Sequence, residues 1–457
     1  MDITINVMQI KKALSLLTEH NFEAYIVGGC VRDKLLGMEP KDYDITTNAL
    51  PDEVINIFKN YHIVETGLQH GTVTVILDNI PIEITTYRID GAYSDNRRPD
   101  NVNFTKNLKN DLARRDFTIN ALAYNKDCII DFFDGRDDLE KRIIRCVGIP
   151  DERFKEDALR ILRALRFSAV LGFDIEDKTA ESIHKNKSLL KNIANERISS
   201  EFSKLLCGDI KYVEKVLIEY IDVFGIFIPE LLPMQNFLQN NEYHIYNVLN
   251  HTIKTVINTP ENLIYRLTAL LHDVGKPSSY TEDNKGVGHF YGHNKKSSEM
   301  AKDILKRLKY DSHTVYRVTT LILFHDIPIE ADEKIIKKRL NKLSYNILKD
   351  LYIIKRADIL SQNLKFISRL EELNKIKEMT DKIISEGQCY SLESLAVNGR
   401  DLKSLKISEG KQVGIILNYL LNAVINGDLI NEKEILLIQA ENYYKHFNKN
   451  PTYNGDG

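Results

Sequence analysis

The residue pattern changes near position 150, and this change constrains the fold more than any other feature of the sequence. Before it, short runs of alternating apolar and polar residues, typical of strands, are interspersed with runs at helical spacing. After it, apolar residues recur every three or four positions almost to the end, as in amphipathic helices. A chain of 457 residues is also too long for one ordinary core. The sequence therefore predicts a head that mixes strands with helices, followed by a long helical remainder.

Individual elements of the head can be predicted from the same pattern. Residues 7–18 have the apolar spacing of an amphipathic helix, and Asp78-Asn79 is a turn signal between two alternating segments. The expected elements are helices over 7–18 and 31–36 and strands over 22–27, 42–45, 72–77 and 82–87.

Charge and cysteine content exclude several classes of protein. Basic residues number 62 and acidic residues 65, so the net charge is −3 and any RNA-binding surface must be local. The five cysteines form no CxxC pair, which argues against a zinc ribbon and a disulfide framework. No apolar stretch reaches the ~20 residues of a membrane span, and the N-terminus lacks the pattern of an export signal. We therefore expect a cytoplasmic protein with no membrane partner.

A glycine pair, Gly28-Gly29, lies between a predicted strand and a predicted helix. Glycine lets the backbone approach a ligand closely, and the start of a helix offers unpaired N–H groups to a phosphate. The same pair is also typical of an ordinary turn, so its meaning depends on the residues that follow.

Two aspartates, Asp42 and Asp44, follow in the segment Lys-Asp-Tyr-Asp. On a strand, residues two apart point to the same face, so both carboxylates are expected to lie together. Like charges held side by side are unfavourable unless a cation lies between them. Glu83, with Ile82 and Ile84 facing the other way, is expected to supply a third carboxylate from a neighbouring strand. The trio predicts a site for two Mg²⁺ ions that activate the attacking and leaving oxygens of a group transfer.

The segment from Gly28 to Asn48 resembles the signature of the class II tRNA nucleotidyltransferases and their bacterial poly(A) polymerase relatives. Further blocks resemble, in the order of that family, the grip on the nucleotide sugar and triphosphate, the head–neck hinge, the nucleotide-selecting helix and the neck-stabilising helix. These blocks are Asp111 to Ala123, Asp131 to Gly135, Glu156 to Arg163, and Glu196 to Glu201. Five ordered blocks within one chain are a specific signal.

The resemblance implies an α+β chain: a polymerase-β-like nucleotidyltransferase head, in which helices cover a small mixed sheet, and an all-α neck, body and tail. It implies an enzyme that adds CCA to the 3′ end of tRNA from CTP and ATP, without a nucleic-acid template. Mg²⁺ would be held by the catalytic residues Asp42, Asp44 and Glu83. The implied nucleotide-binding residues are Gly28, Gly29, Arg32, Arg114, Arg115, Asp116, Asn120, Asp157, Arg160 and Arg163.

By this resemblance, Asp157 and Arg160 choose the nucleotide. Three residues apart on one helix, they would be neighbours, and an acceptor beside a donor can match the edge of a base. The alternative is a surface ion pair, worth at most ~0.5 kcal/mol. The opposite, core-facing stripe is expected to contain Ala158, Ile161, Leu162, Leu165 and Ala169.

The loop from Arg88 to Pro99 bears on which product is made. In the family, members that add only part of CCA tend to have a shortened or altered loop at this place. Here the loop is intact, and its Gly, Asp, Ser and Asn content is typical of a mobile loop. We therefore expect full CCA addition, with A-addition to tRNA and poly(A) synthesis as alternatives.

A set of histidines and aspartates in the helical part predicts a second metal site. Such ligands, collected from several helices, suit a metal ion that activates water. The set resembles the HD phosphohydrolase superfamily, which implies Mn²⁺, Ni²⁺, Fe²⁺ or Mg²⁺ and hydrolysis of phosphoesters. Its members are His251, His272, Asp273, His293, His325 and Asp358.

Three alternatives stay open. The helical domain could be a tRNA-binding scaffold without activity, or the whole protein could be a hydrolase whose head only binds nucleotide. A non-catalytic tRNA-binding protein is the third, but it has no use for clustered carboxylates.

The expected domains are a head over 1–148, a neck with the nucleotide-selecting helix over 149–240, an HD-type domain over 241–370 and a tail over 371–457. Residues 448–457 are expected to be disordered. The sequence does not indicate an oligomeric state.

Overall fold

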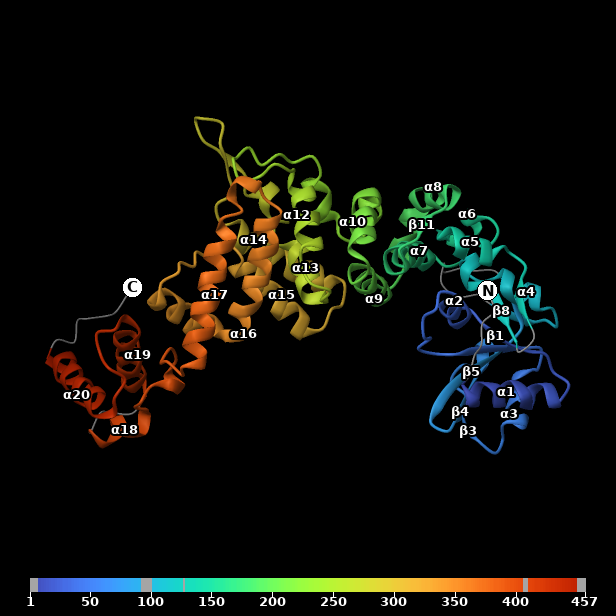
Figure 1. Ribbon diagram of the computed structural model, residues 1–457, viewed down its shortest axis with the longest axis horizontal. Coiled ribbons are helices and arrows are strands. Elements are labelled where there is room, and N and C mark those ends of the chain that lie inside the picture. The colour runs from blue at the N-terminus through green and yellow to red at the C-terminus, as the bar shows by residue number, and fades with distance from the viewer. Residues whose placement is uncertain (1–6, 92–100, 126–127, 406–409, 450–457) are drawn as a thin grey trace. The chain divides into compact units, whose positions relative to one another are not determined.

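A computed structural model describes residues 7–91, 101–125, 128–405 and 410–449 (Figure 1). The chain divides into two compact units. The first contains Met1–Pro233 and Ile304–Asp311, and the second contains Met234–Asp303 and Ser312–Gly457. The four narrower domains expected from the sequence stay a prediction.

A mixed sheet of seven strands lies in the N-terminal part of the first unit, in the order β3-β4-β5-β2-β1-β8-β9. The pair β2–β5 is parallel and the other pairs are antiparallel. The strands are β1 (Ala24–Val27), β2 (Asp44–Thr47), β3 (His62–Val64), β4 (Thr72–Leu77), β5 (Ile80–Thr86), β8 (Leu122–Tyr124) and β9 (Ile129–Asp131).

The hairpin β4–β5 shows why this part of the sheet was predictable. Asp78 and Asn79 both have positive φ, at 48° and 68°. A two-residue turn of this kind fits the twist of the flanking strands, and Asp and Asn tolerate the left-handed region. In β4, alternate residues Val73, Val75 and Leu77 are fully buried. The strand expected over 72–77 is confirmed.

Five helices accompany the sheet and six more follow it within the described part of the first unit (Figure 1). Those in the head are α1 (Met8–Glu19), α2 (Gly29–Leu35), α3 (Pro51–Ile57), α4 (Leu108–Ala113) and α5 (Gly135–Lys141). Those that follow are α6 (Pro150–Glu156), α7 (Leu159–Leu171), α8 (Asp177–Asn186), α9 (Asn195–Leu206), α10 (Ile210–Glu219) and α11 (Ile221–Phe224). Helix α7 ends where Gly172 adopts a left-handed conformation.

The core-facing stripe expected on α7 and just before it is confirmed, because all five of its residues are buried: Ala158, Ile161, Leu162, Leu165 and Ala169. Arg160, expected on the opposite face, is also buried. Helix α7 therefore has protein on both of these faces.

Two local expectations were wrong. The strand expected over 42–45 begins only at Asp44, so Asp42 lies before β2 in irregular backbone. Asp157 lies outside a helix, because it ends α6 with extended backbone and α7 begins at Leu159. If one helix continued through Asp157, the side chain of Asp157 would point in a different direction. Residue spacing alone does not reveal this break between α6 and α7.

The second unit is built from helices, with one two-stranded hairpin, β12 (Thr281–Glu282) and β13 (Gly288–His289). Its helices are α12 (Val248–Ile257), α13 (Leu263–Leu271), α14 (His293–Arg307), α15 (Ser312–Phe324), α16 (Glu333–Leu360), α17 (Arg369–Ser385), α18 (Gly399–Ser404), α19 (Lys411–Asn426) and α20 (Lys433–Lys449). A cluster of buried aliphatic side chains joins α16 and α17, among them Leu348, Leu351 and Ile376. The long helix α16 is kinked at Ser344.

The expected α+β class, with a mixed sheet in the head and helices afterwards, is confirmed. Among the described residues, no helix is both long and apolar enough to cross a bilayer. Most of the loop expected to decide the product, residues 92–100, lies outside the described residues, as do 450–457. Residues 448–449, expected to be disordered, end helix α20.

Candidate functional sites

The carboxylate trio of the head lies on two neighbouring strands and on the segment before one of them. Asp44 in β2 is the register partner of Glu83 in β5. The expected adjacency of these two residues is confirmed. Asp42 precedes β2, and it is exposed, as is Glu83, whereas Asp44 is partly buried.

Burial and repulsion within the trio both disfavour the charged form of Asp44. Burial, Glu83 and Asp42 raise the pKa of Asp44 to about 6, while Arg115 opposes that shift. Within the described part of the chain, none of the three carboxylates forms an ion pair. Their oxygens do not all lie within 4.8 Å of one another, so they form a looser group than the histidines of the second unit. Uncompensated carboxylates are the ligands that Mg²⁺ prefers, so the donor set fits that ion.

The lack of a side chain at Gly28 makes room for Arg115. Gly28 has a φ of 77°, which a residue with a side chain rarely adopts, and a Cβ there would lie 2.9 Å from Nη1 of Arg115. The guanidinium of Arg115 therefore lies against the backbone that leads into α2. Because Arg115 also acts on the pKa of Asp44, it connects the glycine pair with the carboxylates.

Four of the expected nucleotide-binding residues form one chain of hydrogen bonds. Arg32 Nη1 donates to Asn120 Oδ1 at 2.7 Å, and Asn120 Nδ2 donates to Asp116 Oδ1 at 3.0 Å. Nε and Nη2 of Arg163 donate to Asp116 Oδ2 at 2.8 and 2.6 Å. Burial alone would raise the pKa of Asp116, but Arg163 and Asn120 hold it well below its usual value. The chain joins α2 to α7 and fixes the directions of both guanidinium groups.

Asp111 was not singled out from the sequence, although it lies in one of the quoted blocks. Its side chain is fully buried and accepts from Nε and Nη2 of Arg114 at 3.0 and 2.9 Å, and Arg115 Nη2 lies 3.6 Å away. Although burial would raise it, the two arginines lower the pKa of this carboxyl. The available signal was an aspartate three and four residues before an arginine pair on a helix.

Asp157 and Arg160, expected as neighbours, have different partners. Asp157 Oδ2 accepts from Nη2 of Arg197 at 3.2 Å. Nη1 of Arg160 donates to Glu156 Oε2 at 2.7 Å, and its Nη2 donates to the Arg114 carbonyl at 2.8 Å. The structure thus holds each residue separately, and it assigns Arg197 a contact that sequence reasoning missed.

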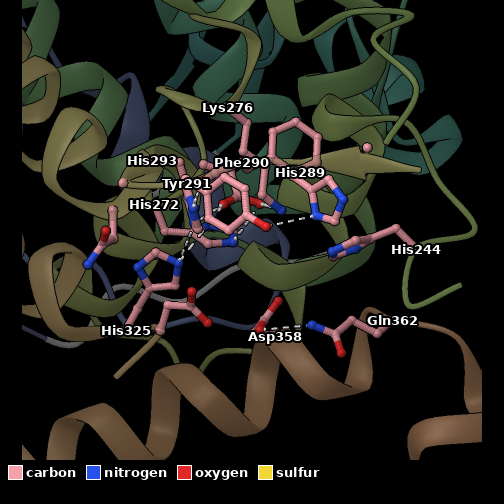
Figure 2. A pocket seen from close by; sticks show the side chains of 15 residues that line it. His244, His272, Lys276, His289, Phe290, Tyr291, His293, His325, Asp358 and Gln362 are labelled. Atoms are coloured by element: carbon pink, nitrogen blue, oxygen red, sulfur yellow. Dashed lines mark hydrogen bonds and ion pairs between the residues drawn. The ribbon is translucent and has the colours of Figure 1, made fainter. Parts of the chain in front are cut away.

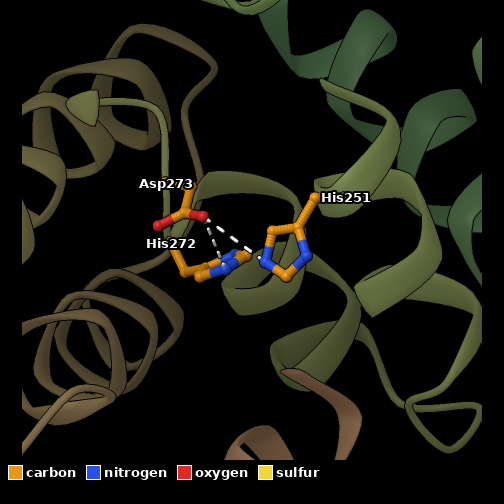
Figure 3. A group of neighbouring side chains, drawn as sticks. All are labelled: His251, His272 and Asp273. Atoms are coloured by element: carbon orange, nitrogen blue, oxygen red, sulfur yellow. Dashed lines mark ion pairs between the residues drawn. The ribbon is translucent and has the colours of Figure 1, made fainter. Parts of the chain in front are cut away.

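The second site, in the second unit, is centred on Asp273 (Figure 3). Its Oδ2 lies 3.2 Å from Nε2 of His272 and 3.5 Å from Nε2 of His251, while its Oδ1 lies 3.5 Å from Nε2 of His293 and 4.0 Å from Nε2 of His325. These residues form two groups of metal-type ligands that share Asp273. The structure therefore brings together all five of these predicted residues.

Backbone carbonyls orient the four imidazole rings. Nδ1 contacts the carbonyl oxygen of Ser361 in His251 (3.2 Å), of Ala269 in His272 (2.7 Å), of Phe290 in His293 (2.9 Å) and of Ile322 in His325 (2.6 Å). Because a carbonyl only accepts, each Nδ1 carries the hydrogen and each neutral ring keeps a lone pair on Nε2. The four Nε2 atoms thereby lie beside Asp273, and those of His293 and His325 also lie 3.3 Å from each other.

The sixth predicted residue, Asp358 on α16, completes the set (Figure 2). Its Oδ1 lies 3.0 Å from Nε2 of His251, and its Oδ2 accepts from Gln362 at 3.0 Å. Five of the six predicted residues, all but His251, border an open pocket of about 340 Å³. His244 and Lys276, which sequence reasoning missed, also line it.

Polar atoms at the centre of this site are left without hydrogen bonds. They are Nε2 of His251 and His272 and both carboxylate oxygens of Asp273. Nζ of Lys276 lies 2.7 Å from Asp273 Oδ2 and forms an ion pair with this carboxylate. Buried polar atoms without hydrogen bonds are rare in native proteins, and a bound ion is one usual partner for them. The donor set fits a transition metal or Mg²⁺.

Family models match three parts of the chain. The model of the poly A polymerase head domain matches residues 24–145, that of the probable RNA- and SrmB-binding site of polymerase A matches 172–231, and that of the putative tRNA nucleotidyltransferase domain 2 matches 289–440.

Relatives match over nearly the full length. The CCA-adding enzyme of Ligilactobacillus salivarius is 35% identical over 447 residues, which covers 95% of this chain and 96% of the relative. That of Streptococcus agalactiae is 35% identical over 440 residues, which covers 95% and 97%. Among solved structures, the CCA-adding enzyme of Bacillus stearothermophilus in complex with CTP has a TM-score of 0.67 at 26% identity and covers 96% of this chain and 98% of its own. The Thermotoga maritima CCA-adding enzyme complexed with tRNA has the same fold, with a TM-score of 0.61 at 21% identity and coverage of 95% and 94%.

Proposed function

Because the chain belongs to the family of CCA-adding enzymes, we propose that its head and the helices that follow form the site of tRNA maturation. The enzyme adds C, C and A to the 3′ end of tRNA, taking them from CTP and ATP and releasing diphosphate. Poly(A) synthesis and A-addition alone are not favoured, since the relatives are CCA-adding enzymes.

The observation that carries the site assignment is the register pair of Asp44 and Glu83, with Asp42 close by and, among the described residues, no cation paired to any of them. These residues would hold Mg²⁺, which when bound supplies positive charge to the attacking and leaving oxygens. The family implies a divalent metal, and the choice of Mg²⁺ is part of the proposal. The three carboxylates therefore orient the reacting groups through the ions they hold.

The arginines supply the contacts to the nucleotide. Arg32 and Arg163 are fixed by the Asn120–Asp116 chain, so their remaining N–H groups can bind phosphate oxygens without losing much side-chain entropy. Asp157 and Arg160 lie at the junction of α6 and α7 and would read the edge of the base. In the absence of a nucleotide, Arg197 would hold the Asp157 carboxylate in place through its hydrogen bond.

The test uses three tRNA acceptors, which end at the discriminator base, at C and at CC. Each is incubated with Mg²⁺ and labelled CTP, ATP or both, and the products are resolved by length. We expect completion to CCA on all three acceptors. Addition of A only, to the CC-ended acceptor, would reject full CCA synthesis, and long A tails would favour a poly(A) polymerase.

A second function is favoured by the orphaned atoms around Asp273. We infer that the second unit binds Mn²⁺, Ni²⁺, Fe²⁺ or Mg²⁺ through His251, His272, Asp273, His293, His325 and Asp358. When bound, such a metal supplies an activated water, so the site would hydrolyse a phosphoester. Lys276 and His244, at the border of the pocket, would face the substrate.

Metal analysis and hydrolysis test this second site together. Release of phosphate or opening of a 2′,3′-cyclic nucleotide is measured with added Ni²⁺ or Mn²⁺, for the wild type, for Asp273→Ala and for Asp42→Ala. We expect hydrolysis to be lost only in Asp273→Ala. Bound metal without hydrolysis of any phosphoester offered would favour the reading of this unit as a tRNA-binding scaffold.

The substrates bear on location. Precursor tRNA, CTP and ATP meet in the cytoplasm of a bacterial cell, so we place the enzyme there, and cell fractionation checks this.

A further inference from the structure

One aromatic ring in the first unit contacts three guanidinium groups. The Cζ atoms of Arg32, Arg163 and Arg166 lie 5.0, 5.3 and 3.9 Å from the centroid of Phe167. All three distances are within the range of cation–π attraction, which is strengthened when water is excluded. Only 5% of Phe167 is exposed, so the ring is largely shielded from water.

The ring itself cannot easily move. Phe167 lies in α7 and packs edge-on against Phe117, with centroids 5.7 Å apart and an angle of 82° between the planes. Phe117 is fully buried and follows Asp116, the carboxylate that binds Arg163. The aromatic pair thus links the backbone next to Asp116 with the helix that carries Arg163.

Each of the three arginines has a separate carboxylate. Arg32 pairs with Asp33 at 2.7 Å, Arg163 with Asp116 at 2.6 Å and Arg166 with Glu201 at 2.7 Å. The carboxylates lie on α2, after α4 and on α9, so the three arginines form ion pairs with three different elements. Among the described residues, the Phe167 ring is the one neighbour shown to contact all three guanidinium groups. Because it contacts them through its face, it accepts no N–H hydrogen bond from them.

We propose that Phe167 is a positioning residue for nucleotide binding, which holds Arg32 and Arg163 at a fixed spacing while leaving their donors free for the nucleotide. This inference rests on the proposed nucleotide site. A ring suits the task because a polar side chain in its place would consume guanidinium donors, and an aliphatic one has no negative face to hold like charges together.

The test compares Phe167→Leu with Phe173→Leu. Phe173 is as deeply buried in the same unit, just after α7, and no guanidinium contact to its ring is found among the described residues. KM and kcat for CTP and ATP are measured on the CC- and C-ended acceptors, together with thermal unfolding. We expect Phe167→Leu to raise KM for both nucleotides about tenfold with a change in kcat of less than about threefold, since one or two desolvated cation–π contacts are lost. Phe173→Leu should lower the melting temperature and leave KM unchanged.

A conservative variant separates positioning from packing. Phe167→Tyr keeps the ring face and should return KM close to the wild-type value, whereas Phe167→Met fills similar volume without a ring and should resemble Phe167→Leu. Equal KM values in the wild type and in Phe167→Met would overturn the proposal. So would loss of folding in both ringless variants while Phe173→Leu folds, because Phe167 would then be a packing residue.

Arg32→Ala and Arg163→Ala distinguish failure of this inference from failure of the proposed site. If these two variants leave KM for CTP unchanged, the nucleotide site itself is misplaced. If they raise KM while Phe167→Leu does not, the site stands and the role of Phe167 is refuted.

Discussion

The two candidate metal sites of this chain are built on opposite principles. In the head, Asp42, Asp44 and Glu83 are exposed or only partly buried, they repel one another, and no described residue forms an ion pair with them. In the second unit, Asp273 is buried among imidazole rings whose directions are fixed by backbone carbonyls. The first site is exposed, and no ion pair among the described residues neutralises it. The second is buried beside an open pocket, and backbone carbonyls preorganise its rings.

This difference indicates how each site would use its metal. Carboxylates at the surface of a sheet bind Mg²⁺ weakly by themselves, because Mg²⁺ dehydrates reluctantly and usually shares its ligands with substrate phosphates. The head therefore suits an ion that arrives and leaves with the nucleotide. Several fixed histidines around a carboxylate suit an ion that stays, since little reorganisation is required on binding.

The largest effect should come from the head. We expect Asp44→Ala to lower incorporation of CTP about a thousandfold or more, because one of the three carboxylates proposed to hold the ions is lost. The measurement is single-turnover addition to the discriminator-ended tRNA. Asp273→Ala serves as the control and should add CCA at the wild-type rate. A wild-type rate in Asp44→Ala would remove the head from the reaction.

Metal retention distinguishes the two sites next. After dialysis against a chelator, the wild type should keep transition metal and Asp273→Asn should not, since its affinity is expected to fall about a hundredfold or more. Asp283→Asn, at an exposed aspartate of the β12–β13 hairpin, is the matched control and should keep its metal. If Asp44→Ala also removed metal that resists dialysis, the proposed contrast between a transient and a resident ion would be wrong.

The sequence was informative wherever chemistry and local pattern coincide. The strand over 72–77 and its turn followed from alternation and from Asp78-Asn79, and the adjacency of Asp44 and Glu83 followed from two predicted strands. The histidine set of the second unit was found through its resemblance, and the structure brings its members together.

What could not be predicted depends on long-range packing. Helix spacing placed Asp157 beside Arg160, but the chain leaves the helix at Asp157, and contacts with α9 decide where its carboxylate points. The same holds for Phe167, whose role depends on guanidinium groups from residues more than a hundred positions apart. Burial of Asp111 and the pairing of Lys276 with Asp273 also arise from tertiary structure.

Nucleotide choice should change less than the rate. We expect Asp157→Ala to reduce the preference for CTP over UTP about ten- to a hundredfold, because a partly buried acceptor that matches one base edge discriminates by leaving other bases unpaired. The ratio of kcat/KM for the two nucleotides is the measurement. Asp151→Ala is the matched control and should leave the ratio unchanged, because it removes an aspartate of α6 that pairs with Lys185 on α8. An unaltered ratio in Asp157→Ala would defeat its assignment as selector.

The smallest expected effect is on stability, and it reports the cost of burying the Asp44 carboxylate beside Glu83 and Asp42. Because the pKa of Asp44 is raised from 3.8 to about 6 in the folded chain, folding favours its protonated form. The corresponding stability is present below about pH 4 and is lost as pH rises through about 6.

At pH 7.5 without metal, Asp44→Asn should therefore be more stable than the wild type by about 1–2 kcal/mol, or a few degrees in melting temperature, and the difference should shrink at pH 5. Mg²⁺ with nucleotide should stabilise the wild type and not the variant. Asp33→Asn, beside Arg32, is a control of opposite sign, since it loses an ion pair. If Asp44→Asn were instead destabilising at pH 7.5, Asp44 would be compensated within the protein, and the head would not need an ion from outside to relieve its repulsion.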